Sequence, residues 1–203
     1  MKRYIDSSIS FEEYLGLIDS LLAEGKTTGP KQSESMFNYG RLNRARMGRL
    51  EKTIELDDRT RARIAGLNAD WIWLIITEGW CGDAAQNIPV IEKIAVTNPG
   101  IETRYILRDE YPELVDQFLT NGSRSIPKLI AVNRRSGEVL GTWGPRPRAA
   151  HDLFNEQKSS GIDKDAIHEN LQRWYLADRG RSVQSEIAEL AEVWVGIPFA
   201  KAA

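Results

Sequence analysis

WIWLIITEGWCGDA, at residues 71–84, is the stretch of this 203-residue chain that decides the fold. Its first half, Trp71–Ile76, is a continuous apolar run rich in aromatic and β-branched residues, which is typical of a strand buried on both faces. The run ends at Glu78, and from about Gly82–Val96 apolar residues recur at helical spacing. The single cysteine, Cys81, is therefore expected where a buried strand passes into a helix.

The position of Cys81 favours a reactive thiol. A side chain at the start of a helix meets unpaired backbone amides and the positive end of the helix dipole, and both favour a thiolate over a thiol. The sequence therefore predicts a lowered pKa for Cys81. The alternative is that Cys81 is a packing residue, because free cysteine is among the residue types most often buried.

Apolar spacing and turn residues predict helices on both sides of this stretch. Before it we expect a helix at 11–22, a second helix capped by Ser33, and a third at about 58–67. After it we expect a strand at 102–107, a helix at 112–120, strands at 128–132 and 138–143 joined by a turn at 135–137, a helix ending near 159, and two further helices. This order predicts the α/β class, with a mixed central sheet flanked by helices.

Length and composition predict one domain with added helices. The chain has 203 residues, of which 41% are hydrophobic and 28% are charged, which is enough for one sizeable core. We expect residues 1–67 to form an N-terminal helical extension, residues 68–159 the α/β core, and residues 160–203 a set of C-terminal helices. A formal net charge of -2 indicates no global attraction to nucleic acid or to an anionic membrane surface.

A single cysteine excludes several kinds of site. It rules out an intrachain disulfide and a zinc site built from paired cysteines, and His151 and His168 show no metal-ligand spacing. We therefore expect neither a metal nor another cofactor. The first residues lack the apolar segment of a signal peptide, and the longest apolar run is too short to span a bilayer, so the simplest interpretation is a soluble cytoplasmic protein.

Three marks around the cysteine together resemble the thioredoxin family. Trp80-Cys81-Gly82 matches the first three residues of the family's Trp-Cys-Gly-Pro-Cys motif. Pro89 lies eight residues after the cysteine, the spacing at which thioredoxins kink their active-site helix. Ile126-Pro127, just before the predicted hairpin, resembles the family's cis-proline loop, and a cis peptide bond almost always precedes a proline.

The resemblance covers about residues 68–159, and the whole chain, including Thr27-Thr28-Gly29-Pro30 and the late Leu171-Gln172-x-Trp174-Tyr175, resembles a bacterial branch with helical extensions. It implies a thioredoxin-like fold and thiol chemistry at Cys81. It also implies that Ile126 aligns a substrate in extended conformation beside the proline, as the family binds extended chains.

Three departures from the family pattern limit this chemistry. Ala84 occupies the position of the second cysteine, so no internal thiol can attack a mixed disulfide formed at Cys81. Asp83 replaces the proline between the two cysteines, and its charge opposes thiolate formation if it points at the sulfur. Ile75 takes the place of the buried acid that thioredoxins keep on the preceding strand. The resemblance therefore implies a single thiol without the family's usual route for proton transfer.

The candidate site residues follow from these motifs. Cys81 is the candidate catalytic residue, and the candidate substrate-binding residues are Trp80, Gly82, Asp83, Arg124, Ile126 and Pro127. Arg124 could supply a cation to the thiol or could be an exposed arginine in a loop. Glu78 could be a general base beside the thiol, but a solvated glutamate at the strand end is the simpler interpretation.

Two hypotheses of different class account for a single thiol at this position. In the first, the protein is a monothiol oxidoreductase: Cys81 forms a mixed disulfide with a protein or low-molecular-weight disulfide, and an external small thiol releases it. In the second, the thioredoxin fold is kept as a redox-inactive binding or scaffolding module. A third hypothesis, an iron-sulfur carrier of the monothiol glutaredoxin kind, lacks a recognisable glutathione-site pattern. The retained cysteine slightly favours the first.

Overall fold

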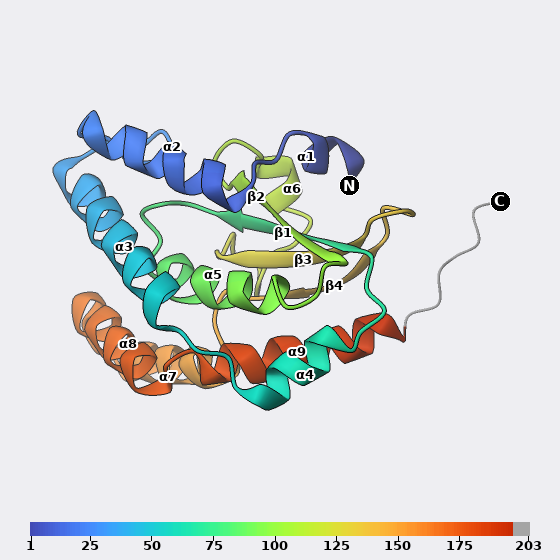
Figure 1. The fold of residues 1–203 in the computed structure, drawn as a ribbon. Coiled ribbons are helices and arrows are strands. Elements are labelled where there is room, and N and C mark those ends of the chain that lie inside the picture. The colour runs from blue at the N-terminus through green and yellow to red at the C-terminus, as the bar shows by residue number, and fades with distance from the viewer. Residues whose placement is uncertain (197–203) are drawn as a thin grey trace.

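A four-stranded mixed sheet forms the centre of the computed structural model, which describes residues 1–196 (Figure 1). The strands, β1 (Trp71–Thr77), β2 (Ile101–Leu107), β3 (Lys128–Asn133) and β4 (Val139–Trp143), lie in the order β2-β1-β3-β4. Strand β1 is parallel to β2 and antiparallel to β3, and β3 is antiparallel to β4. Every residue of β1 and β3 is buried, as expected of strands covered on both faces. The predicted mixed sheet is confirmed.

The N-terminal helices begin at capping residues that the sequence displays. Helix α2 (Phe11–Ala23) begins with a capping box, in which the Ser10 hydroxyl accepts from the Glu13 amide and the Glu13 carboxylate accepts from the Ser10 amide. Helix α3 (Glu34–Thr53) begins at Ser33, as predicted, and α4 (Asp58–Ala65) follows it. No helix within residues 1–196 combines the length and the apolar character needed to cross a membrane.

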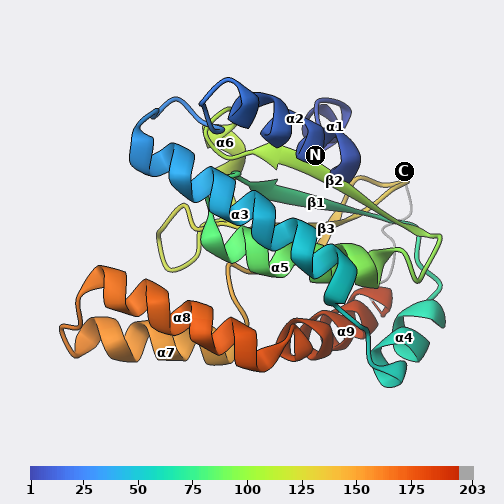
Figure 2. The ribbon, with the colours of Figure 1, turned by 60° about the vertical axis from the view of Figure 1, so that its left-hand side comes forward.

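Helix α5 (Gly82–Ala95) carries the cysteine at its start and lies between the sheet and the added helices. Most of its residues are buried, because the sheet covers one side and α3, α4 and α9 (Arg181–Val195) contact it elsewhere. Figure 2 shows the start of α5 between α3 and α8 (Lys164–Asp178). The two helical extensions therefore flank the end of α5 that bears the thiol.

The C-terminal helices pack on one another and on α5. Helix α7 (Arg148–Ser159) pairs with α8, and the two share a small apolar cluster separate from the main core. Gly180, with φ +75°, forms the turn between α8 and α9, and a Cβ there would lie only 2.8 Å from a methyl group of Val90 in α5. A glycine is needed at this position both for its backbone angle and for the close approach to α5.

Two segments differ from the sequence-based expectation. Helix α6 (Pro112–Val115) is one turn long rather than extending to Thr120, because the chain continues in turns with amide hydrogen bonds from Gln117 to Leu114 and from Phe118 to Val115, and Thr120 then pairs with Ser123 in an antiparallel bridge. A short helix α1 (Lys2–Asp6) was not predicted at all, since so brief a segment shows no helical apolar pattern. Figure 1 shows α1, α2 and α6 on the side of the sheet opposite α9.

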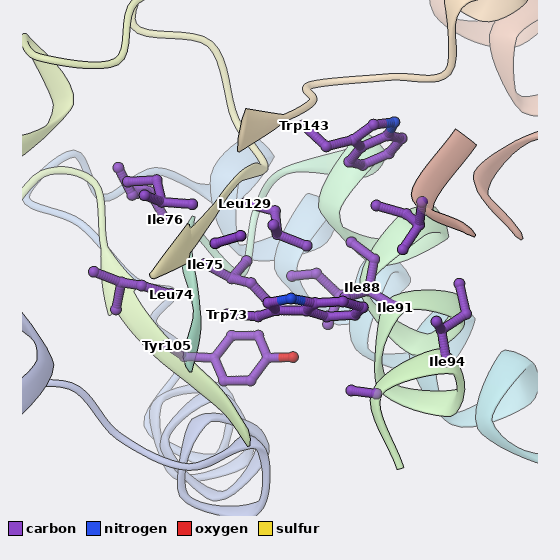
Figure 3. Close-up of a cluster of buried hydrophobic side chains, with 14 of the residues drawn as sticks. Trp73, Leu74, Ile75, Ile76, Ile88, Ile91, Ile94, Tyr105, Leu129 and Trp143 are labelled. Atoms are coloured by element: carbon purple, nitrogen blue, oxygen red, sulfur yellow. The ribbon is translucent and has the colours of Figure 1, made fainter. Parts of the chain in front are cut away.

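The core joins the sheet to the C-terminal extension through tryptophan contacts. The Trp194 ring of α9 lies edge-on to the rings of Trp71 and Trp73, with centroid distances of 6.1 and 6.2 Å. Gly141 of β4 lies directly beneath the Trp194 indole and leaves no space for a side chain. Figure 3 shows Trp73 among buried isoleucines of α5. Helix α9 is therefore built into the same core as the sheet.

Replacing Trp194 by alanine is expected to lower the free energy of unfolding by about 3–5 kcal/mol, because it leaves a cavity between α9 and the two buried tryptophans. The matched control is Val193→Ala on the same helix, where the side chain is 63% exposed, and its effect should stay within about 0.5 kcal/mol. Denaturant unfolding measures both. An equally small loss for Trp194→Ala would contradict both the packing and the predicted single domain.

Candidate active site around Cys81

Cys81 lies at the junction of three elements. It is the N-cap residue of α5, and its sulfur accepts a hydrogen bond from the Ala84 amide at 3.4 Å. Its thiol donates to the carbonyl oxygen of Ile126 at 3.3 Å, and the Ile126-Pro127 peptide bond is cis. The sulfur thus has one backbone donor from its own helix and one backbone acceptor from the opposite loop, while 8% of the residue surface is exposed.

The expectation that the helix start lowers the pKa of this thiol is wrong. Burial, followed by the charge of Asp83, raises the pKa of Cys81 to about 12. The amides of Ala84 and Asp83 and the charge of Arg146 act in the opposite direction but are weaker. The thiol is therefore protonated at neutral pH.

The carboxylate of Asp83 is held by two side chains from distant parts of the sequence. Arg146, in the loop after β4, donates to Oδ2 of Asp83 through Nη2 at 2.7 Å and Nε at 2.8 Å. The Tyr175 hydroxyl of α8 donates to the other oxygen at 2.8 Å. Both charged side chains are largely buried, so Arg146 offsets much of the charge of Asp83, while the Tyr175 hydrogen bond ties the start of α5 to the C-terminal extension. Sequence reasoning missed Arg146 and Tyr175 as site residues, because Arg146 belongs to no recognisable motif and the resemblance at Leu171-Gln172-x-Trp174-Tyr175 assigns Tyr175 no role.

A groove of about 710 Å³ opens in front of the cysteine. Helix α3 forms one wall, α8 forms the other, and the loops that carry Trp80 and Ile126 lie between them. The predicted site residues that line it are Trp80, Cys81, Gly82, Asp83, Arg124 and Ile126, whereas Pro127 is not among the lining residues. A volume of this order accommodates a small molecule or a few residues of an extended peptide.

Arg124 lines the groove, and its guanidinium forms an ion pair with a carboxylate there. Its guanidinium donates to both carboxylate oxygens of Asp116, each at 2.7 Å, and both side chains are about half exposed. This hydrogen-bonded pair lowers the pKa of Asp116. Arg124 is therefore an ion-paired loop residue that faces the groove, and it has no hydrogen bond to the thiol.

Glu78 is fully buried, so the expectation of a solvated strand-end glutamate is wrong. One of its carboxylate oxygens accepts from the Asp109 amide at 3.0 Å, and the other has no hydrogen-bond partner within residues 1–196. Burial raises the pKa of this carboxyl. Next to it, the Thr28 hydroxyl accepts from the Gly79 amide at 2.8 Å, so the N-terminal extension is fastened to the loop that leads into Cys81.

These features together define a thioredoxin-like protein: a parallel strand pair followed by an antiparallel hairpin, a cysteine at the start of the helix after β1, and a cis-proline loop facing it. The chain belongs to the thioredoxin family, since the family model described as Thioredoxin matches residues 29–159. Residues 1–196 contain no group of three or more His, Cys, Asp and Glu side chains that could hold a metal ion.

Two solved structures share the fold at low sequence identity. A protein of unknown function from Pseudomonas aeruginosa is 16% identical with a TM-score of 0.64, and the match covers 93% of this chain and 95% of that one. An HIV epitope-scaffold is 17% identical with a TM-score of 0.55, covering 94% of this chain and 100% of that one. No curated protein matches the sequence. These likenesses extend over both helical extensions, and they concern the fold alone.

Alkylation of Cys81 by iodoacetamide should accelerate about tenfold per pH unit from pH 7 to pH 10 without levelling off, because only the thiolate reacts and burial holds its pKa near 12. The unfolded protein in urea is the reference, with a half-maximal rate at about pH 8.5 and a plateau above about pH 9.5. Asp83→Asn should react faster than the wild type, whereas Asp165→Asn, at an exposed position in the groove wall, should not. If the alkylation rate of the folded wild type levelled off between pH 6 and pH 8, the pKa of Cys81 would be lowered rather than raised.

Glu78→Gln should stabilise the protein more at pH 7 than at pH 4. The folded-state pKa of Glu78 is raised, so the folded protein binds more protons than the unfolded chain, and its stability falls as the pH rises above the unfolded value of about 4.3. Glutamine removes that dependence while keeping an acceptor for the Asp109 amide. Urea unfolding at the two pH values measures the difference, with Glu110→Gln as the exposed control. An identical effect at both pH values would mean that Glu78 titrates normally.

Proposed function

We propose that the protein carries out thiol-disulfide exchange through Cys81 as a monothiol. The observation that supports this most directly is the position of the thiol in the wall of a groove, at the start of α5 and against the carbonyl of Ile126. Ala84 leaves no internal resolving thiol, so the co-reactant is an external low-molecular-weight thiol.

The proposed cycle has two balanced steps. In the first, the Cys81 sulfur attacks one sulfur of a disulfide, forms a mixed disulfide with it, and the departing sulfur takes up the proton that the thiol loses. In the second, the external thiol attacks the mixed disulfide, forms a new disulfide with the substrate sulfur, and returns a proton to Cys81. The protein is neither oxidised nor reduced over the cycle. Because the supply of reduced small thiol is greatest in the cytoplasm, we place the protein there.

The residues around the thiol have separate parts in this cycle. The Ile126 carbonyl accepts the thiol hydrogen, and its position beside the cis-proline suits alignment of an extended substrate. Arg146 offsets the charge of Asp83 when the sulfur becomes anionic. Trp80 forms part of the groove wall, with the Arg108 guanidinium 4.7 Å from its ring centroid. The partner in this proposal is a protein or small-molecule disulfide, without a role for nucleic acid or a membrane.

A second candidate function is binding or scaffolding without turnover. The raised pKa and near-complete burial of Cys81 favour it, because a protonated thiol is a poor nucleophile at neutral pH. The same groove between α3 and α8 holds the ligand in that case. The two candidates differ in whether the Cys81 sulfur forms a covalent bond during the encounter.

Turnover of a mixed-disulfide substrate with excess 2-mercaptoethanol distinguishes the two candidates. The wild type should release the substrate thiol faster than the uncatalysed background, with a rate that rises from pH 7 to pH 9 as the thiolate fraction increases. With the resolving thiol omitted, mass spectrometry should detect the protein carrying one substrate thiol. Cys81→Ser, which differs by one atom, should show neither. Equal rates for the wild type and Cys81→Ser leave only the binding module.

A further inference from the structure

A half-buried guanidinium lies in the same groove as the thiol and has no acidic partner among residues 1–196. Arg46 of α3 lines the groove and donates to the Asn43 side-chain oxygen at 2.9 Å, but it forms no ion pair in the part of the chain that the structure describes. Burial lowers its pKa, which reflects the cost of holding a cation away from water without a counter-charge. Its environment therefore favours the approach of an anion.

The guanidinium is held in place by the loop that carries the cysteine. Asn43 is fully buried and donates to the Gly79 carbonyl at 3.3 Å, so it links Arg46 to the residues just before Cys81. Nη1 of Arg46 lies 3.9 Å from the position that a Cβ at Gly82 would occupy. The absence of a side chain at Gly82 leaves this position open.

A second donor from the opposite wall faces the same position. The side-chain oxygen of Gln172 accepts from Gln86 at 2.7 Å, which turns its amide nitrogen toward Gly82, 3.5 Å from the same Cβ position. That nitrogen donates no hydrogen bond to any residue in 1–196. Donors from α3 and α8 thus converge beside Gly82, one of them charged, with no protein acceptor between them.

The other arginines of the groove have carboxylate partners. Arg108 contacts Asp109 at 2.8 Å, Arg124 contacts Asp116, and Arg146 contacts Asp83. Arg46 therefore differs from them in keeping its charge available to a ligand. A carboxylate is the ligand group that matches a planar guanidinium beside an amide donor, because each of its oxygens can accept one of the two hydrogen bonds.

We propose that the groove selects thiols and disulfides that carry a carboxylate close to their sulfur, with Arg46 and Gln172 as the residues that bind it. The proposal rests on the exchange function proposed above and specifies its substrate class. The carboxylate must lie near the sulfur, on the same residue or on the residue next to it, because Gly82 directly follows Cys81. Arg46 belongs to the N-terminal extension and Gln172 to the C-terminal helices, so the two extensions jointly set the specificity.

The test compares two matched substrates, the symmetrical disulfides of N-acetyl-glutamyl-cysteine amide and N-acetyl-glutaminyl-cysteine amide, with excess 2-mercaptoethanol at pH 8. The wild type should have a KM about tenfold lower for the acidic disulfide, as expected for one charge-assisted interaction. Arg46→Gln should abolish the preference, and Arg46→Lys should retain part of it. Arg41→Gln, an equal charge change at an exposed position on the same helix outside the groove, should keep it in full.

Calorimetric binding of the two disulfides to Cys81→Ser separates this proposal from the exchange function. Equal KM and equal Kd values for the two disulfides overturn the acidic preference and leave exchange intact. If the wild type turns over neither disulfide faster than Cys81→Ser, exchange fails, and the ratio of the two Kd values then decides the acidic preference by itself. A preference that persists in Arg46→Gln overturns the assignment of Arg46. Circular dichroism of each variant confirms that it is folded.

Discussion

The burial of β1 on both faces is the constraint from which the site follows. A strand whose side chains are all buried has to lie inside the sheet and be covered by helices above and below. The residues that follow β1, including Cys81, therefore lie beneath the helices that cover the sheet. Helices α3 and α8 leave a groove at that point, and the thiol lies in its wall rather than on an open surface. The packing that buries β1 therefore also determines the environment of the Cys81 sulfur.

Desolvation is the strongest of the opposing effects that set the pKa of Cys81. Two backbone amides at the helix start and the nearby Arg146 stabilise a thiolate, as in any cysteine at such a position. Removal of water by the surrounding walls and the charge of Asp83 oppose them and are stronger. A substrate that brings its own charge into the groove, or that displaces the Ile126 carbonyl from the thiol, changes this balance. Reactivity in such a site depends on what is bound as well as on the free protein.

Much of the fold could be predicted from the sequence because its signals are local. The apolar run at 71–76, the cap Ser33, and the glycine turn at 135–137 each act through neighbouring residues. The site was only half predictable: the motif residues located the thiol, but no sequence pattern shows that Arg146 and Tyr175 reach Asp83 across the tertiary fold. The burial of Glu78 was unpredictable for the same reason, because the loop of residues 27–30 that covers it is distant in sequence. Desolvation is a property of the assembled protein, so the pKa of the cysteine could not be read from its place in the chain.

The composite construction of the groove has a consequence for how the protein becomes functional. One wall comes from α3, near the beginning of the chain, and the other from α8, near its end. Cys81 is synthesised before α8, so the groove in which the thiol lies is complete only once α8 has packed against the rest of the chain. A minimal sheet-and-helix core cut from this chain would keep the motif and lose both walls of the groove.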